Sequence, residues 1–319
     1  MRLKHIDILR GIAAIMVTVF HLARSSDAPL NSFDFSKYGW VGVQIFFVIS
    51  GFILPYSLYK TGYQTKDFGV FVLKRIIRIY PAYIAAILIG IVLTIVTGRE
   101  LIPTYALASQ LLFLNDIVGF PGSSAVFWTL AIEFQFYLLI GLLYSYFLIS
   151  NGRSICLVFA LTLASIWIKQ PCFILTWFPY FGIGIMIFNK KFTNLSEWMF
   201  WLSICILLSV TTIMHGMPYT IAALFAVIFI LYANFDKETV ILKILVFLGT
   251  ISYSLYLIHW DLGRAAVRLS RHLPLINTIG LLRVILGVIF SIFCAWLLYI
   301  LIERRSAKFS AGIKYKKNT

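Results

Sequence analysis

The feature that most constrains this chain is a succession of long apolar runs separated by short polar stretches. Ten of them approach or exceed the roughly 20 apolar residues that a helix needs to cross a bilayer. Charged residues make up only 12% of the chain, far below the share with which a soluble domain covers its surface. The runs therefore predict an all-α, polytopic membrane protein and exclude a soluble enzyme. The predicted spans are 6–23, 39–58, 79–97, 127–149, 154–169, 172–188, 197–214, 218–234, 244–260 and 279–302.

Basic residues mark the N-terminus, the loops at 59–78 and 189–196, and the C-terminal tail. Cytoplasmic loops of membrane proteins carry an excess of Lys and Arg, so all four segments are expected in the cytoplasm. The chain must then cross an even number of times between the two loops. A further short run, 104–118, would make that number odd if it crossed. We therefore predict about ten transmembrane helices, cytoplasmic N- and C-termini, and an interfacial or re-entrant 104–118.

The excess of basic residues gives the chain a net charge of +15. In a membrane protein such an excess is expected to mark cytoplasmic loops, so we predict no nucleic-acid partner. The loop 261–278 is an exception, because it carries Arg264, Arg268 and Arg271 although parity places it outside. It is either a tolerated departure from a statistical rule or the sign of an acidic or sugar-phosphate partner. The four cysteines form no CxxC pair, and we expect no metal site.

Arg10 and His21 stand in the first predicted span, where ionisable side chains are costly and are therefore functional candidates. Their spacing is close to three helical turns, so they share a helix face about 16 Å apart along the axis. Taken singly, Arg10 can extend to the inner headgroups and His21 can sit in the outer interface. Two such residues on one face favour a shared functional path.

Two further ionisable residues lie within predicted spans. Glu133 is expected about 9 Å below the outer end of 127–149, where a carboxylate needs a partner, a proton or water. Both a structural ion pair and a catalytic or substrate-binding role remain open for it. His259 ends the span 244–260 among aromatic residues, as part of an interfacial belt or as a functional group. Gly51, in the middle of its span, predicts close helix packing.

Lys74, Arg75 and Arg78 precede the span 79–97 on its predicted inner side. Arg75 and Arg78 are three residues apart and share a helix face. Pro81 leaves backbone groups without helical partners nearby. The run is either a topological anchor or a cytoplasmic phosphate clamp, since a guanidinium group can bind phosphate through two parallel hydrogen bonds.

These residues resemble the acyltransferase-3 family of bacterial multi-span acyltransferases, many of which O-acetylate surface polysaccharides. The resemblance covers essentially residues 5–305, and the family's ten-span domain agrees with the count from hydropathy. We predict an acyltransferase-3-like transmembrane domain over 1–305 and a short basic cytoplasmic tail over 306–319. The chain lacks the periplasmic esterase-like domain of many members, and Gln44 stands where many have an acidic residue. The matching motifs are Ile6–Ala14 with His21, Phe46–Phe52, Lys74–Pro81, Trp128–Tyr137 and Ser252–His259.

The resemblance implies transfer of an acyl group, most often acetyl, from cytoplasmic acyl-CoA to a hydroxyl of an extracytoplasmic carbohydrate. O-antigen, exopolysaccharide, capsule and lipid-linked saccharides are all open as acceptors. The protein would be a multi-pass protein of the bacterial cytoplasmic (inner) membrane, with acetyl-CoA as donor substrate and no permanently bound cofactor. The alternative is a transporter or flippase of acyl groups or lipid-linked sugars. The absence of an internal repeat argues against that alternative.

The resemblance also implies a donor site. Arg10, Arg75 and Arg78, helped by Lys74, would bind the phosphates of acyl-CoA at the inner face. The pantetheine arm is long enough to bring the thioester across about 16 Å to His21.

The reaction would then take place at the other end of the first span. His21 would act as general base or carry the acyl group in transit, and both remain open. Glu133 would orient His21 or balance its charge, as an acidic partner does in other histidine mechanisms. His259 would contact the acceptor or help to polarise the carbonyl group. Trp128 and Tyr137 would stack on a sugar ring.

Overall fold

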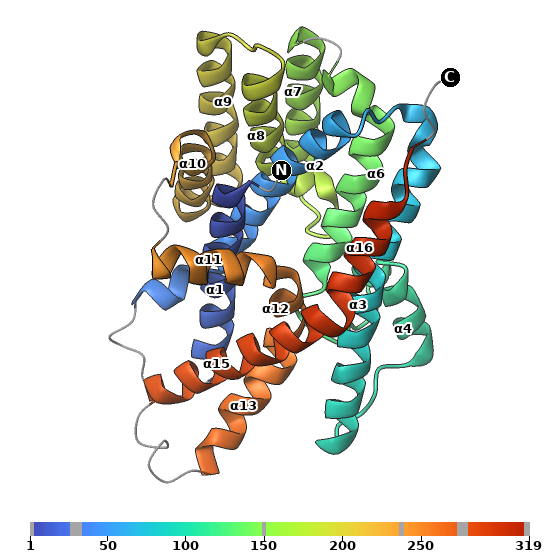
Figure 1. Ribbon diagram of the computed structural model, residues 1–319, viewed down its shortest axis with the longest axis vertical. Helices are drawn as coiled ribbons and strands as arrows, with labels where there is room; N and C mark the ends of the chain where they lie inside the picture. The colour runs from blue at the N-terminus through green and yellow to red at the C-terminus, as the bar shows by residue number, and fades with distance from the viewer. Residues whose placement is uncertain (1–2, 26–33, 149–150, 236–238, 273–279, 316–319) are drawn as a thin grey trace. The chain divides into compact units, whose positions relative to one another are not determined.

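In a computed structural model, each of the predicted spans forms helix, and the described residues contain no strand (Figure 1). The described residues are 3–25, 34–148, 151–235, 239–272 and 280–315. The all-α prediction is confirmed. By their contacts, the residues group into two units, which are described separately.

Unit 1 comprises Met1–Val43, Ile77–Trp128 and Lys237–Phe309. Two segments of its chain are π-helical, His259–Gly263 and Tyr299–Glu303. Short π-helical stretches inside α-helices occur frequently at functional sites. The α-helices of unit 1 are α1 (Lys4–Ala23), the larger part of α3 (Phe68–Val96), α4 (Thr104–Leu111), α5 (Asn115–Val118), α11 (Val240–Thr250), α12 (Ser252–Ile258), α13 (Arg264–Leu269), α15 (Gly280–Leu298) and the start of α16 (Arg304–Gly312).

Helix α1 packs directly on α11, and the two cross in Figure 1. A Cβ atom on Gly249 would stand 1.8 Å from the backbone oxygen of Asp7, and one on Gly11 would stand 2.4 Å from that of Leu245. Only glycine allows backbones to approach so closely, as in other membrane helix pairs. The two glycines therefore fix α1 against α11.

Unit 2 comprises Gln44–Ile76, Thr129–Asp236 and Ser310–Thr319. The predicted close packing at Gly51 is confirmed, because a Cβ atom there would stand 2.2 Å from the backbone oxygen of Phe181. The helices of unit 2 are most of α2 (Gly42–Lys60) and α6 (Trp128–Leu148), the start of α3, α7 (Asn151–Trp167), α8 (Ile174–Phe192), α9 (Glu197–His215) and α10 (Met217–Tyr232), with the end of α16.

The number of spanning helices differs from the prediction of about ten. Six helices of the described chain are long and apolar enough to cross a membrane, or seven if a bent pair counts as one span. The predicted spans 154–169 and 218–234 form the shorter helices α7 and α10, which have 17 and 16 residues. Hydropathy alone treated every apolar run as a span, whereas part of this apolar surface lies in helices near or below the needed length.

The predicted span 244–260 is broken. It forms α11 and α12, with a bend of 61° at Ile251. The 104–118 segment contains α4 with 8 residues and α5 with 4, each too short to cross a bilayer. The prediction that 104–118 does not span is therefore confirmed, whereas its interfacial position and the sidedness of the termini stay predictions.

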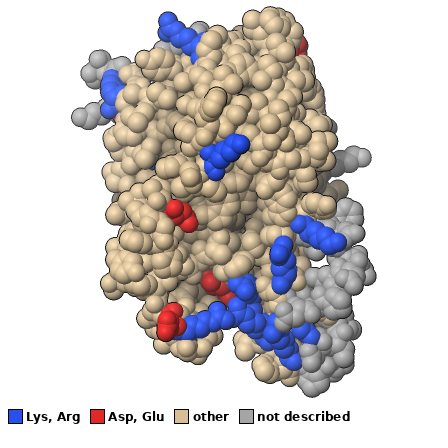
Figure 2. Space-filling model, turned by 180° about the vertical axis from the view of Figure 1, so that it is seen from behind, with Lys and Arg blue, Asp and Glu red and all other residues tan. Residues whose placement is uncertain are grey.

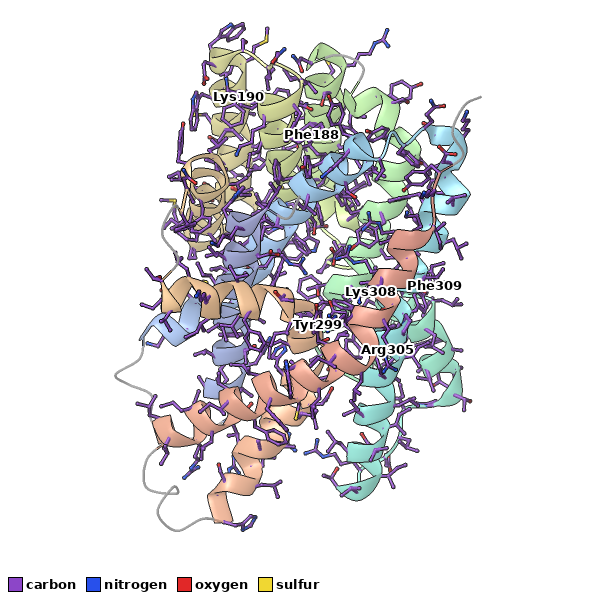
Figure 3. All side chains as sticks on the ribbon, viewed as in Figure 1. Phe188, Lys190, Tyr299, Arg305, Lys308 and Phe309 are labelled. Carbon is purple, nitrogen blue, oxygen red and sulfur yellow. The ribbon has the colours of Figure 1, made fainter. Side chains whose placement is uncertain are left out.

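The predicted tail 306–319 is helical as far as Gly312, as part of α16. Figure 3 shows Arg305, Lys308 and Phe309 along this helix and Tyr299 in the segment that precedes it. The hydroxyl of Ser310 donates a hydrogen bond to the backbone oxygen of Lys74 at 2.8 Å. The tail thus runs beside the first turns of α3. Residues 316–319 of the tail, and 273–278 of the predicted loop 261–278, lie outside the described residues.

Candidate active site

One helix of unit 1 carries both ionisable residues of the first span. Arg10 and His21 lie on α1, and both are half-buried. Eleven residues of helix separate them by about 16 Å along the axis. Each belongs to a different cluster of polar side chains within unit 1, so α1 links the two clusters.

The first cluster surrounds His21. Its ring centroid lies 5.3 Å from that of His259 and 4.8 Å from that of Trp260, whose plane is nearly perpendicular. His259 is fully buried. The structure therefore brings together the two histidines that the sequence placed in different spans, and it adds Trp260 to them.

The backbone fixes the protonation of His259. Its Nδ1 atom lies 2.8 Å from the backbone oxygen of Tyr256 and 3.1 Å from that of Leu255. A carbonyl oxygen can only accept, so Nδ1 carries the hydrogen and donates it. In the neutral ring Nε2 is then a lone-pair acceptor, and this buried atom makes no hydrogen bond to any described residue. A buried acceptor without a partner is costly, which makes it a candidate for chemistry.

The motif that ends in His259 also explains how the ring is held. The Tyr253 hydroxyl donates to the backbone oxygen of Ile79 at 3.0 Å, and the Tyr256 hydroxyl donates to that of Val126 at 3.0 Å. These bonds anchor α12 to two other segments of unit 1. At His259 the helix changes from α to π. The two tyrosines thus position His259, whereas its place in an interfacial belt stays a prediction.

The second cluster surrounds Arg10. The carboxylate of Glu303 interacts electrostatically with Arg10 and Arg78. It also accepts hydrogen bonds from the Ser254 hydroxyl at 2.6 Å and from the Ser254 backbone nitrogen at 3.2 Å. Glu303 and Ser254 are both buried. Two arginines predicted to bind phosphate, the half-buried Arg10 and the exposed Arg78, thus both act electrostatically on one buried carboxylate.

Sequence analysis missed Glu303. It stands at the end of the last apolar run, directly before Arg304 and Arg305, and reads as the boundary of a span. The sequence signal that could have revealed Glu303 was its acidic side chain, because the apolar run 279–302 directly before it contains no other carboxylate. In the structure it is the last residue of the π-helical segment Tyr299–Glu303.

Arg75 and Lys74 belong to unit 2. The Arg75 guanidinium lies over the rings of Phe71 and Tyr137, at 5.2 and 5.3 Å from their centroids. Lys74 donates to the backbone oxygen of Ile313 and lies 5.0 Å from the centroid of the Tyr315 ring. Tyr137, predicted to stack on a sugar, is buried and faced by Arg75. Its stacking role is untested.

Glu133 also belongs to unit 2, where it accepts a hydrogen bond from the Ser50 hydroxyl at 3.0 Å. Its predicted partnership with His21 is therefore still a prediction. Trp128 is half-buried at the start of α6 and stays a predicted acceptor contact. Gln44 is buried, and its Oε1 makes no hydrogen bond to any described residue.

Comparison with known proteins gives relatives of one kind. A viral protein of the Acidianus two-tailed virus, provisionally named an acetyltransferase, is 27% identical over 307 residues, which cover 88% of this chain and 85% of the relative. The peptidoglycan O-acetyltransferase OatA of Listeria monocytogenes is 30% identical over 153 residues, 42% of this chain and 23% of the relative. The O-acetyltransferase OatA of Staphylococcus aureus is 29% identical over 161 residues, 46% of this chain and 25% of the relative. No solved structure matches the chain.

The chain therefore spans only about a quarter of the length of these two bacterial relatives. A family model described as an acyltransferase domain (Acyl_transf_3) matches residues 3–300. That match covers nearly the whole chain, and it confirms the resemblance read from the five motifs. The protein belongs to the acyltransferase-3 family and is a multi-pass membrane acyltransferase.

Proposed function

We propose that the protein transfers an acyl group, acetyl by preference, from cytoplasmic acyl-CoA to a hydroxyl group of an extracytoplasmic carbohydrate. The observation that carries the proposal is the arrangement of unit 1. A single helix, α1, joins a cationic cluster at Arg10 to an imidazole pair at His21 and His259. The two clusters are about one pantetheine arm apart, since eleven residues of helix rise about 16 Å.

The donor half of the proposal rests on Arg10 and Arg78. Both carry permanent positive charge, and guanidinium groups match phosphate oxygens in geometry. Glu303 interacts electrostatically with both side chains, and one carboxylate cannot neutralise two guanidinium groups, so a net positive charge is left for the phosphates of CoA. Arg75 and Lys74 lie earlier on α3 and extend this basic run in unit 2.

The chemical half rests on the imidazole pair. Nε2 of His259 takes the proton of the acceptor hydroxyl as its oxygen attacks the thioester carbonyl carbon. The C–O bond forms, the C–S bond breaks, and the thiolate of CoA recovers the proton from the imidazolium ring. His21, beside His259, contacts the acyl group of the bound thioester. The fixed hydrogen on Nδ1 supports His259 as the proton acceptor.

The acceptor side of the proposal rests on the names of the relatives and on one aromatic side chain. The relatives from Listeria and Bacillus subtilis carry names that mention peptidoglycan O-acetylation. Those names support a cell-envelope carbohydrate as acceptor here. Trp128 is the residue of this chain that we assign to the sugar ring, and the cytoplasmic membrane is the location that a CoA donor requires.

The test is release of free CoA thiol by the purified full-length protein in detergent, with and without a carbohydrate acceptor. The proposal predicts thiol release that depends on both protein and acceptor, together with an acetyl mass shift on the carbohydrate. The variant His259→Gln, which keeps size and polarity, is expected to release little thiol. A transporter or flippase would release none with the wild-type protein, and that result would overturn the proposal.

A further inference from the structure

Beside the imidazole pair, unit 1 gathers a group of arginines with few acidic neighbours. Arg264 interacts electrostatically with Arg268 and Arg99, and Arg268 interacts with Arg99 and Arg271. Figure 2 shows the basic side chains densest at its lower end, where Figure 1 draws α13. We define the arginine cluster as Arg24, Arg99, Arg264, Arg268 and Arg271.

The arginines of this cluster come from segments that are distant in the sequence. Arg271 donates a hydrogen bond through Nη2 to the backbone oxygen of Ser25, the residue after Arg24. Arg24 and Arg264 both act electrostatically on His21. Arg99 follows the end of α3. The fold therefore brings three separate stretches of positive charge to one end of unit 1.

Among the described residues, the acidic groups near the arginine cluster do not balance its charge. Asp261 is the carboxylate that interacts with Arg264 and Arg268, and Glu100 follows Arg99 in the chain as an exposed residue. The like charges of these arginines repel one another, so a bound anion would offset the free energy that the arrangement costs. The Nε atom of Arg264 is also buried and makes no hydrogen bond to any described residue.

The cluster is continuous with the proposed reaction centre. The Arg264 guanidinium lies 4.1 Å from the centroid of the Trp260 ring, and the same ring lies 4.8 Å from that of His21. The indole ring of Trp260 thus lies next to both Arg264 and His21. An anion held by Arg264 and Arg268 would stand close to the acceptor hydroxyl rather than at a remote surface.

We propose that the arginine cluster binds a phosphate or diphosphate group carried by the acceptor, and so selects phosphorylated saccharides over neutral ones. The inference rests on the proposed function and adds the chemical class of its second substrate. A phosphate group presents several oxygens and more than one negative charge, which fits several guanidinium groups better than a single carboxylate does. The same chemistry occurs in the headgroup of an anionic phospholipid, so the experiment separates the two sources.

The first arm measures anion binding without any acyl transfer. Full-length protein in phosphatidylcholine nanodiscs, saturated with CoA to occupy the donor site, is titrated with inorganic pyrophosphate in a calorimeter. The double variant Arg264→Gln/Arg268→Gln is expected to bind at least about tenfold more weakly. The matched control Arg304→Gln/Arg305→Gln removes two charges from α16 and is expected to bind as wild type does. Equal binding by all three proteins, or equal loss in the control, overturns the proposal.

The second arm repeats the titration with phosphatidylglycerol in the nanodisc. If pyrophosphate binding persists there, the site accepts a phosphate other than a lipid headgroup, as the proposal requires. If phosphatidylglycerol abolishes it, the cluster is a headgroup site and the acceptor assignment is wrong. Retained CoA binding by the double variant shows that the protein is folded.

The third arm compares acyl transfer to a glycoside and to the same glycoside bearing a 1-phosphate. The expected result is a higher kcat/KM for the phosphorylated acceptor, with the preference reduced about tenfold in Arg264→Gln/Arg268→Gln. Equal use of both acceptors by the wild type overturns the phosphate inference while leaving acyl transfer intact. Failure of the proposed function looks different, because neither acceptor would then stimulate thiol release, and the pyrophosphate titration would still decide the binding claim.

Discussion

The two polar clusters of unit 1 differ in how completely their buried polar atoms are paired with hydrogen-bond donors or opposite charges. Around Arg10, a buried carboxylate stands among two arginines and a serine that donates twice to it. Around His21, the Nε2 atom of His259 has no hydrogen-bond partner among the described residues, and positive charge is in excess. A satisfied buried network holds side chains in place, whereas an unsatisfied acceptor is available to take part in chemistry. The first cluster is thus suited to hold a donor, and the second to act on it.

The largest effect is expected at the unsatisfied cluster. His21→Ala and His259→Gln should each lower kcat on the order of 10²- to 10⁴-fold, because His259 takes the proton of the acceptor and His21 contacts the acyl group. Affinity for CoA should change little, since neither side chain belongs to the Arg10 cluster. Single-turnover assays and CoA titration separate the two quantities. A variant that retains most of the wild-type rate removes its histidine from the mechanism.

The next largest effect concerns the carboxylate that satisfies the first cluster. Glu303→Gln removes a buried carboxylate that interacts electrostatically with Arg10 and Arg78 and accepts two hydrogen bonds from Ser254, and it should destabilise the protein by about 1–3 kcal/mol. The matched control is Glu197→Gln, because Glu197 pairs with Lys190 but is 71% exposed. Exposed ion pairs contribute about 0–1 kcal/mol to stability. The control should therefore unfold at nearly the same temperature as the wild-type protein. Equal unfolding temperatures for both variants would show that the Arg10 cluster does not depend on Glu303.

A smaller effect is expected from single arginines. Arg78→Ala should weaken CoA binding about tenfold to a hundredfold, the worth of one charge-assisted phosphate contact. Arg75→Ala should weaken it less, because its guanidinium already lies over two aromatic rings. Arg78→Lys should recover only part of the loss, since lysine cannot bind phosphate through two parallel bonds. Normal CoA binding by both alanine variants would reduce the basic run to a topological anchor.

The smallest effect tests whether Glu133 belongs to the His21 cluster. If the two side chains act together, Glu133→Gln and His21→Ala should be non-additive in a double-mutant cycle, with a coupling of about 0.5–3 kcal/mol. Ser50→Ala, which removes the hydroxyl bonded to Glu133, serves as the companion variant. Multiplicative losses in rate would assign Glu133 to a structural role within unit 2.

The sequence predicted most of the helices, because long apolar runs without charge have few alternatives to helix in a membrane. It did not predict the bend at Ile251, since the break carries no proline and the flanking Thr250 and Ser252 are both tolerated within helices. The span count failed for a related reason. An apolar composition indicates that a segment avoids water. It does not indicate whether the segment packs against lipid or against other helices.

The site could be predicted where ionisable side chains, which are costly within a membrane span, recur at helical spacing. Arg10 and His21 on one face of α1 are the example. Their partners were not predictable, because spacing within one helix says nothing about which other helix packs on it. Glu303 lies almost three hundred residues from Arg10 in the sequence and reads as the end of a span. The tautomer of His259 likewise follows from two backbone oxygens and from no side chain.

The central claim is that α1 connects a donor site on one side of the membrane to a reaction centre that serves the other. The most direct measurement uses proteoliposomes loaded with labelled acetyl-CoA, with the carbohydrate acceptor supplied only outside. The account predicts labelled acetyl carbohydrate in the outer solution with the wild-type protein, and none above background with His21→Ala. Product that forms only when donor and acceptor share a compartment, or that forms equally with His21→Ala, would contradict it.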